Sequence, residues 1–316
     1  MRAYIIKRLL LAIPTLVLVT IIIFFTIRLI PGDVIDMMAE QQSFVTGASI
    51  ETLKHELGLD VPITTQYGRW IWEFLQGDLG DSLWTGRPVI LQIIPRIPIS
   101  FELGILALVI SQIIALPIGI FSAIRQDTMG DYIGRSIAII CIALPSFWLG
   151  TIVMVYPAIW WNWSPSMEYI SFAENPLKNI TMFIIPAIIL GMVLSGTTMR
   201  MTRTMMLEVL RQDYIRTAWA KGLKEKVVII RHALKNALIP VVTIIGLQVP
   251  VLIGGSVILE NIFNLPGIGS LTIKVIEQRD YTVLSGVNLI IASLVLITNI
   301  IIDIAYSYLD PRIKYR

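Results

Sequence analysis

Six stretches of mostly apolar residues, each long enough to cross a membrane as a helix, recur along this chain. They cover approximately residues 9–30, 99–124, 135–161, 180–200, 237–259 and 284–308. Runs of about 20 apolar residues span a hydrocarbon core of about 30 Å. The runs are continuous rather than alternating, which disfavours a transmembrane barrel. The pattern therefore predicts an all-α polytopic membrane protein with six transmembrane helices.

Composition supports this class. Of the 316 residues, 55% are hydrophobic and only 15% are charged, whereas soluble domains carry about a quarter charged residues. The single cysteine, Cys141, lies inside an apolar run and is predicted to be a small core residue. Prolines at positions 14, 117, 145, 157, 186 and 250 fall inside the predicted spans. Interior prolines kink helices, which is typical of a bundle that lines a cavity but also occurs in static bundles.

Basic residues are distributed unevenly between the two sides of the predicted bundle. With the N-terminus inside, inner segments hold 17 of the 25 Lys and Arg residues: three in the N-terminal tail, two between the second and third spans, nine in 200–235 and three in the C-terminal tail. Cytoplasmic loops carry such an excess of Lys and Arg. Both termini are therefore predicted to be cytoplasmic.

This orientation divides the chain into four parts. Residues 1–30 are the N-terminal tail and first transmembrane helix, and 31–98 form an external segment. Residues 99–310 form a core with five transmembrane helices, including a cytoplasmic segment at 200–236, and 311–316 are a cytoplasmic tail.

The external segment is too long for a plain connection. One helix is predicted from Ser49 to about Gly58, and a second contains Tyr67, Trp70, Ile71 and Phe74 and ends at Gly77. A third is predicted to begin at Pro88 and run along the membrane before Pro98 opens the second span. Either a packed cap over the bundle or a docking surface for an external partner fits this pattern.

A second outer loop joins the last two spans. Pro266, Gly267 and Gly269 are turn residues, and Ile262, Phe263 and Leu265 give the loop an apolar tip. We favour a contact with an external partner or a gate over a plain amphipathic hairpin. The candidate residues are Phe263, Pro266, Gly267 and Gly269.

The cytoplasmic segment is basic and helix-favouring. Asp213 is placed to stabilise the start of a short helix over about 213–221, and Gly222 suits a left-handed residue just past its end. Ala218 and Ala220 keep the helix slim enough for another protein to approach. A second helix, from about 226, leads into the fifth span at residue 240. Composition alone fits equally a surface helix attracted to anionic lipid.

The order of short motifs along the chain distinguishes these alternatives. They are Pro31-Gly-Asp33, Leu57-Gly-Leu-Asp60, Gly77-Asp-Leu-Gly80, Arg96-Ile-Pro98, Leu144-Pro-Ser-Phe-Trp-Leu-Gly150, Tyr214-Ile-Arg-Thr-Ala218, Ala220-Lys-Gly222, Arg231-His-Ala-Leu234, Arg279-Asp-Tyr281 and Tyr308-Leu-Asp-Pro-Arg312. This order resembles the dipeptide/oligopeptide permeases of ABC importers, in the branch of the first permease subunit. The resemblance covers nearly the whole chain. One departure stands out: the Glu-Ala-Ala that begins the general importer signature is here Arg216-Thr217-Ala218.

The resemblance implies a type I ABC importer permease fold in a bacterial or archaeal cytoplasmic membrane. It implies as partners a second homologous permease, two ATPase subunits inside and a substrate-binding protein outside. The short helix would then couple transport to the ATPase, with Asp213, Arg216, Thr217, Ala218, Lys221 and Gly222 as the candidate residues. ATP and Mg²⁺ are expected in the ATPase subunits, and no cofactor or metal in this chain.

The sequence argues against chemistry in this chain itself. It contains no Gly-x4-Gly-Lys-Ser/Thr phosphate loop, and its two histidines, His55 and His232, are far apart. We therefore expect neither an enzyme nor a nucleic-acid partner. Polar or small residues in the kinked spans are candidates for lining a pathway, although helix packing is their commoner use. They are Ser146, Ser195, Thr198, Gln248 and Ser256.

Two other functions were weighed against that of a permease subunit. An ion-coupled secondary transporter requires buried acids near mid-membrane and commonly internal repeats, and neither is evident in the sequence. A purely structural membrane protein does not explain the ordered cytoplasmic signature. Within the resembling family the substrate is open between di- or oligopeptides, glutathione, nickel complexes and oligosaccharides. The partner permease is either a distinct relative, which the resemblance favours, or a second copy.

Overall fold

The computed structural model describes residues 2–29, 61–165 and 168–309. Within these ranges the regular secondary structure is helical, apart from one isolated bridge between Asp81 and Pro88. It divides into two compact units, which are described separately: Met1–Ile99 with Pro266–Ile300, and Ser100–Leu265 with Ile301–Arg316. The helix expected between Ser49 and Gly58 lies outside the described residues.

The first unit contains α1 (Arg2–Arg28), α4 (Ile63–Leu75), α5 (Val89–Ile93), α14 (Ile268–Glu277) and most of α15 (Tyr281–Leu309). Its helices enclose one apolar core. The core residues are Ile27, Leu79, Val89, Ile93, Ile268, Leu271, Val275, Val283, Leu284, Val287 and Leu289. Residues from the first hundred and from the last third of the chain thus share one core.

Helix α4 is the amphipathic helix expected around Tyr67, and its aromatic face packs on α1. The rings of Tyr67 and Phe24 are 5.3 Å apart, and the hydroxyls of Tyr67 and Thr20 lie within 3.0 Å of each other. Gly77, with φ +84°, follows the helix end in the left-handed region as expected. The sequence prediction of this helix is confirmed.

A buried polar contact joins the turn after α4 to the start of α15 in the same unit. The Ser82 hydroxyl donates to the Asp280 carboxylate at 2.6 Å, and the Trp84 indole N–H donates to the carbonyl of Gln278 at 2.7 Å. Asp280 also accepts from the backbone N–H of Val283 at the start of the helix. The Arg279-Asp280-Tyr281 motif therefore holds two distant segments of this unit together.

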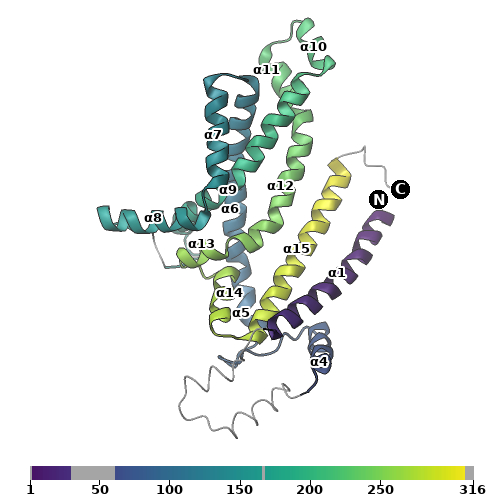
Figure 1. The fold of residues 1–316 in the computed structure, drawn as a ribbon, viewed down its shortest axis with the longest axis vertical. Coiled ribbons are helices and arrows are strands. Elements are labelled where there is room, and N and C mark those ends of the chain that lie inside the picture. The colour runs from purple at the N-terminus through teal and green to yellow at the C-terminus, as the bar shows by residue number, and fades with distance from the viewer. Residues whose placement is uncertain (1, 30–60, 166–167, 310–316) are drawn as a thin grey trace. The chain divides into compact units, whose positions relative to one another are not determined.

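The second unit is a bundle of α6 (Ile97–Ile124), α7 (Met129–Ala143), α9 (Pro176–Leu210) and α12 (Lys235–Gly255), drawn from blue to green in Figure 1. Further helices flank it: α8 (Ser146–Trp161), α10 (Asp213–Ala220), α11 (Glu225–Val227) and α13 (Val257–Ile262). A π-helical stretch, Val228–Leu234, joins α11 to α12. Helix α9 packs between α7 and α12.

Among the described residues, five helical stretches are long and apolar enough to cross a membrane. They are Arg8–Arg28, Val89–Ile124, Pro176–Leu210, Glu225–Pro250 and Tyr281–Ile304. The pair of α7 and α8 makes a sixth only if a bent pair counts as one span. These helices agree with the predicted class. The helix predicted to begin at Pro88 is α5, and it does not end before the second span but continues into α6 through the turn Ile94–Arg96.

The span predicted over 135–161 is bent at Pro145, one of the prolines that were expected to kink the spans. Helix α7 ends at Ala143, and α8 leaves at 88° to it, as Figure 1 shows. Pro145 has no backbone N–H, and the residue before a proline is driven out of the helical region. Leu144 accordingly has φ −81° and ψ 120°. An apolar pattern does not distinguish a straight helix from two helices joined at such a bend.

Glycines allow the closest helix contacts of the second unit. A Cβ atom built on Gly119 of α6 would lie 2.8 Å from the carbonyl oxygen of Met199 on α9. A Cβ atom built on Gly196 of α9 would lie 2.7 Å from the carbonyl oxygen of Ala138 on α7. Both distances are shorter than contact distance to a rigid backbone, so α6, α7 and α9 approach only because these side chains are absent.

We expect Gly119→Ala to destabilise the protein by about 1–3 kcal/mol, because the added methyl group forces α6 away from α9. The matched control is Gly68→Ala in α4, where an added Cβ meets no atom within 4 Å. Thermal unfolding of the purified variants measures the difference. Equal melting temperatures for the two variants would contradict this account of the packing.

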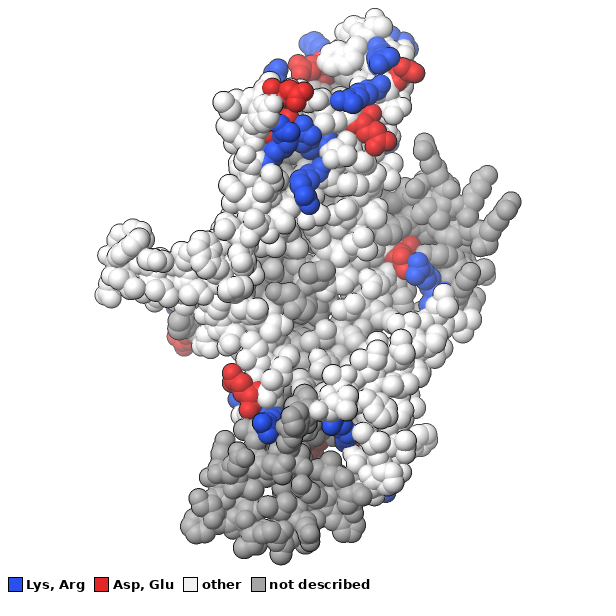
Figure 2. Space-filling view, in the orientation of Figure 1, with Lys and Arg blue, Asp and Glu red and all other residues white. Residues whose placement is uncertain are grey.

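Charged side chains gather at one end of the second unit. On the face shown in Figure 2, blue and red atoms cover the end that carries α10, and the surface toward the middle of the unit is uncharged. On this face the unit thus combines an uncharged surface with a charged end.

Candidate functional site

Helix α10 stands between α9 and α11 at the charged end of the second unit. It begins at Asp213 after Gln212, which has extended backbone angles, and it ends at Ala220. Gly222 follows with φ +74°, and its N–H donates to the carbonyl of Trp219 at 2.9 Å. The short helix, its acidic first residue and its left-handed glycine are all where the sequence predicted them.

One face of α10 packs against the rest of the unit. Ile215 and Ala218, three residues apart, are 0% and 6% exposed and join an apolar cluster with Met206 of α9. That cluster also contains Ala123, Val228, Ala233 and Ala237. Ala218 therefore packs on the buried side of the helix, against the bundle. It does not lie on the outer surface, where the sequence analysis placed it.

The other face of α10 is exposed. Asp213 and Arg216 form an ion pair at 3.4 Å, with 94% and 75% of their side chains exposed. Thr217, whose hydroxyl donates to the Asp213 carbonyl, also lies on this side, and Lys221 and Gly222 follow at its end. Such an exposed pair contributes little to stability. These charged groups remain available to a partner.

Two aromatic residues of α10 were missed by the sequence analysis. Trp219 is 45% exposed and Tyr214 is 43% exposed. The Tyr214 hydroxyl accepts from the side-chain amide of Asn236 at 2.9 Å, which ties α10 to α12. A sequence signal for Trp219 exists: the apolar residues Ile215 and Ala218, three apart, mark the buried face of the helix, and Trp219 lies just outside that face. An exposed tryptophan is a frequent anchor of protein interfaces.

Beside α10, a buried carboxylate connects α6, α7 and α9. Asp131, at the start of α7, is fully buried and accepts two hydrogen bonds from Arg203 of α9, both at 2.7 Å. The Ser122 hydroxyl of α6 and the backbone N–H of Asp127 also donate to it. A planar guanidinium paired with a carboxylate in this way fixes orientation as well as distance. The end of α9 that leads to α10 is thereby attached to the α6–α7 turn.

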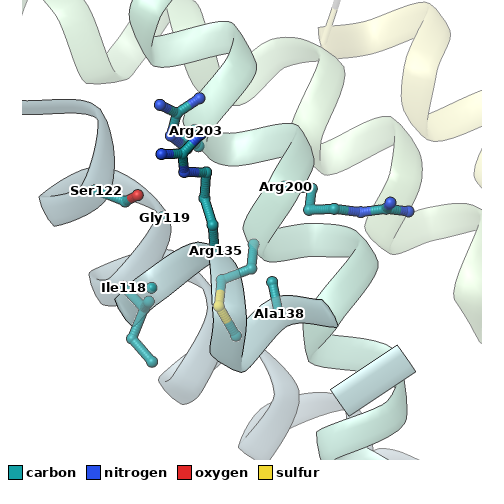
Figure 3. A pocket seen from close by; sticks show the side chains of 9 residues that line it. Ile118, Gly119, Ser122, Arg135, Ala138, Arg200 and Arg203 are labelled. Carbon is teal, nitrogen blue, oxygen red and sulfur yellow. The ribbon is translucent and has the colours of Figure 1, made fainter. Parts of the chain in front are cut away.

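Figure 3 shows the small pocket next to this carboxylate, between α6, α7 and α9. The guanidinium groups of Arg135 and Arg203 lie on the same side of it, whereas Arg200 extends away. The Arg135 Nε is 3.6 Å from Asp131, and its guanidinium stacks on the Tyr132 ring at 4.4 Å. Since Arg203 holds the carboxylate at shorter distances, Arg203 is the structural partner.

Four of the five candidate pathway residues are buried within the second unit. Gln248 of α12 donates to the Leu194 carbonyl at 3.0 Å and to the Thr198 hydroxyl at 3.1 Å. Ser195 donates to the Met192 carbonyl, and Ser256 to the Glu260 carboxylate at 2.7 Å. Ser146 is half-buried at the start of α8. The structure brings Thr198 and Gln248 together, and their role as pathway lining stays a prediction.

The expected apolar loop tip is buried. Phe263 and Leu265 are 2% and 1% exposed, and Phe263 lies close to Gly150 of α8. The left-handed residue at this turn is Asn264, with φ +51°. Gly267 has an extended conformation before α14, and Gly269 lies inside that helix. The expectation that Gly267 and Gly269 form the turn is therefore wrong, because an Asn residue also tolerates the left-handed region. The contact role of Phe263, Pro266, Gly267 and Gly269 is not tested.

Within the described residues, no group of His, Cys, Asp and Glu is placed to hold a metal ion. The features that remain are a short exposed helix at the charged end, a buried ionic attachment behind it, and membrane-length helices. Together they define a membrane protein that carries a short exposed helix at its charged end.

Comparison with known proteins identifies the class. Residues 115–315 match the family of binding-protein-dependent transport system inner membrane components, and residues 1–104 match the N-terminal region of the same membrane components. The chain belongs to this family: it is a permease subunit of a binding-protein-dependent ABC transporter, which is the non-catalytic membrane component of such a system.

Particular relatives are similar over their full lengths. The dipeptide transport system permease protein of Escherichia coli K12 is 36% identical over 339 residues, and that of Alkalihalophilus pseudofirmus is 39% identical over 339 residues. Each comparison covers 100% of both chains. The crystal structure of an amino acid ABC transporter with histidines matches 69% of this chain and 94% of its own, with a TM-score of 0.54 and 10% identity. This likeness supports the fold.

Proposed function

We propose that this chain is one permease subunit of an ATP-driven importer of di- or oligopeptides, and that α10 is its coupling helix. The observation that carries the coupling role is the division of α10 into a buried face with Ile215 and Ala218 and an exposed face with Arg216 and Trp219. A helix whose buried face is packed against the bundle transmits force from a partner on its exposed face to the bundle. The names of the full-length relatives support the peptide substrate class.

In this proposal the chain forms half of the translocation pathway and a second homologous permease forms the other half. Two ATPase subunits, which bind ATP and Mg²⁺, contact α10 from the cytoplasm. An extracytoplasmic binding protein delivers the peptide at the opposite side. The chain crosses the cytoplasmic membrane of a bacterium or archaeon with both termini inside, in accordance with the distribution of its Lys and Arg residues.

In this proposal the path of force follows the contacts of α10 with its neighbours. Helix α10 follows α9 after a two-residue connection, and the Arg203–Asp131 pair attaches that end of α9 to α7. On the other side, Tyr214 and the shared apolar cluster attach α10 to the α11–α12 segment. A displacement of α10 therefore pulls on α7, α9 and α12 together.

The test of the assignment is reconstitution of this chain with its partner permease, ATPase subunits and binding protein in proteoliposomes. We expect uptake of labelled dipeptide that requires internal ATP and the binding protein. Uptake of a nickel complex, glutathione or an oligosaccharide, but no peptide, would overturn the substrate class while keeping the transporter class. Uptake driven by an ion gradient without ATP would overturn the coupling proposal.

Trp219→Ala tests the coupling surface directly. We expect the ATPase subunits to bind the purified permease pair about 30-fold more weakly, because a central interface tryptophan contributes about 2 kcal/mol or more. Trp72→Ala is the matched control, since Trp72 on α4 is 64% exposed and lies in the proposed external segment. Equal ATPase affinity for the two variants would remove Trp219 from the interface.

A further inference from the structure

Helix α9 exposes two different sides along its length. In its first half the exposed large apolar residues are three or four apart: Leu177, Ile180, Ile184 and Ile188. Lys178 and Thr181, which are also exposed, lie near the start of the helix. Successive residues of a helix are rotated by about 100°. The side that these residues define continues through Gly191, Ser195, Met199 and Thr202, all of which are buried. The exposed side has therefore changed by the middle of the helix.

In the second half the exposed residues are polar. They are Thr197, Arg200, Thr204 and Glu208, again three or four apart, and we call them the open face of α9. By the same rotation this face lies about 180° from the apolar side of the first half. Three other sides of this half are covered by neighbours in the same unit. Helix α6 approaches Met199 and Thr202, α7 approaches Gly196 and Arg203, and α12 contacts Leu194 and Thr198.

Arg200 is the only cation on this open face. Its side chain is exposed and forms no hydrogen bond or ion pair with any residue that the structure describes. Arg203, three residues later, is instead held by Asp131. Figure 3 shows the two arginines extending to different sides of α9. Arg203 thus stabilises the fold, and Arg200 is available to a ligand.

A polar open face on a membrane-length helix requires a polar surrounding. Lipid-facing sides of spans are apolar, as is the side of α9 that carries Ile180, Ile184 and Ile188. Ionisable residues in spans face a bundle interior or a water-filled cavity. Thr197 lies within the predicted apolar span 180–200, and Arg200 is at its end. Water or a polar ligand therefore fits the open face better than acyl chains do.

The geometry points to the open face of α9 as part of the inner pathway wall, where Arg200 attracts the carboxylate of the peptide that passes. This inference rests on the proposed import of peptides. A peptide with a free C-terminus carries a carboxylate, and an unpaired guanidinium is its complementary group. The Thr204 hydroxyl donates to the Arg200 carbonyl at 2.9 Å, so it leaves the guanidinium free. Pathway lining thus moves from the buried Ser195 and Thr198 to Thr197 and Arg200.

The first experiment asks whether the open face meets water. Cys141 is the only cysteine of this chain, so Cys141→Ala leaves the chain without a thiol of its own, and labelling is measured on this subunit alone. In the reconstituted complex, Thr197→Cys and Ile188→Cys are treated with membrane-impermeant thiol reagents, with and without ATP. We expect Thr197→Cys to react at least tenfold faster than Ile188→Cys in one of these states. Equal rates in every state, or a faster reaction at Ile188→Cys, would overturn the pathway wall.

The second experiment asks what Arg200 attracts. An anionic thiol reagent should react about threefold faster than a cationic one at Thr197→Cys, because Arg200 lies one turn away on the same face. Adding Arg200→Gln should abolish this preference, and adding Arg200→Lys should keep it. If Thr197→Cys shows no such preference while Arg200 is still present, a carboxylate of the partner permease lies at Arg200, and the proposal is overturned. A preference that appears only in vesicles without anionic phospholipid indicates a lipid headgroup, with the same consequence.

The third experiment separates this inference from the proposed function. We expect ATP-driven dipeptide uptake to fall about tenfold with Arg200→Gln and to stay within about twofold with Arg200→Lys, at equal amounts of assembled complex. Full uptake with Arg200→Gln would overturn the carboxylate contact and leave peptide import intact. If the wild-type complex imports no peptide, the proposed function and the carboxylate contact fail together, whereas the labelling result still decides whether the open face lines a pathway.

Discussion

Replacing Gly222 by proline is expected to abolish ATP-driven uptake while the protein still inserts into the membrane. Gly222 has φ +74°, and proline is restricted to about −65°. Proline also removes the N–H that donates to the Trp219 carbonyl. The end of α10 must therefore rearrange, and Trp219 moves with it. Uptake per amount of membrane-inserted complex measures the effect.

Gly222→Ala is the control for this change. An added Cβ meets no atom within 4 Å, so alanine brings only the cost of a left-handed conformation, about 1–2 kcal/mol. We expect partial uptake by this variant and none by Gly222→Pro. Uptake by Gly222→Pro at the wild-type rate would show that the shape of this helix end is not used in coupling.

Replacing Arg203 by glutamine is expected to destabilise the protein by about 3 kcal/mol. The change leaves the fully buried Asp131 without its two bonds from the guanidinium. Removing one partner of a buried ion pair typically costs about 3–5 kcal/mol. The lower end applies because Ser122 and the Asp127 N–H still donate to the carboxylate. Thermal unfolding of the purified permease pair measures this loss.

Arg200→Gln is the matched control, since it removes the same charge from the same helix without breaking a described contact. We expect its melting temperature to stay near that of the wild type. Adding Asp131→Asn to Arg203→Gln should recover part of the lost stability, because the double variant no longer buries an unpaired charge. If Arg203→Gln and Arg200→Gln have the same melting temperature, the Arg203–Asp131 pair does not attach α9 to α7.

Local signals were sufficient wherever a single segment decides its own structure. The start of α10 at Asp213, its end before Gly222 and the aromatic face of α4 all follow from residues within two or three turns of each other. The resemblance to peptide permeases also came from short motifs in order along the chain. Full-length relatives confirm the family and leave the roles of the individual site residues as predictions.

Local signals do not give the direction of a side chain where that direction depends on a distant helix. Ser195, Thr198, Gln248 and Ser256 are polar residues in kinked spans, yet all four are buried against other parts of the chain. Thr197, one residue before Thr198, and Arg200, one residue after Met199, face outward instead. Polarity shows that a residue needs a partner, but not where that partner lies.

The sequence by itself determined that this chain crosses the membrane with apolar helices and that a short basic segment carries a helix ended by glycine. Both follow from local hydrophobicity and from backbone preferences, which need no distant contact. Only the tertiary structure decided which side of α9 is open, which arginine pairs with Asp131, and that α10 rests on Ile215 and Ala218. These outcomes depend on how closely α6, α7 and α12 approach α9, and that approach is set by packing between segments far apart in the chain.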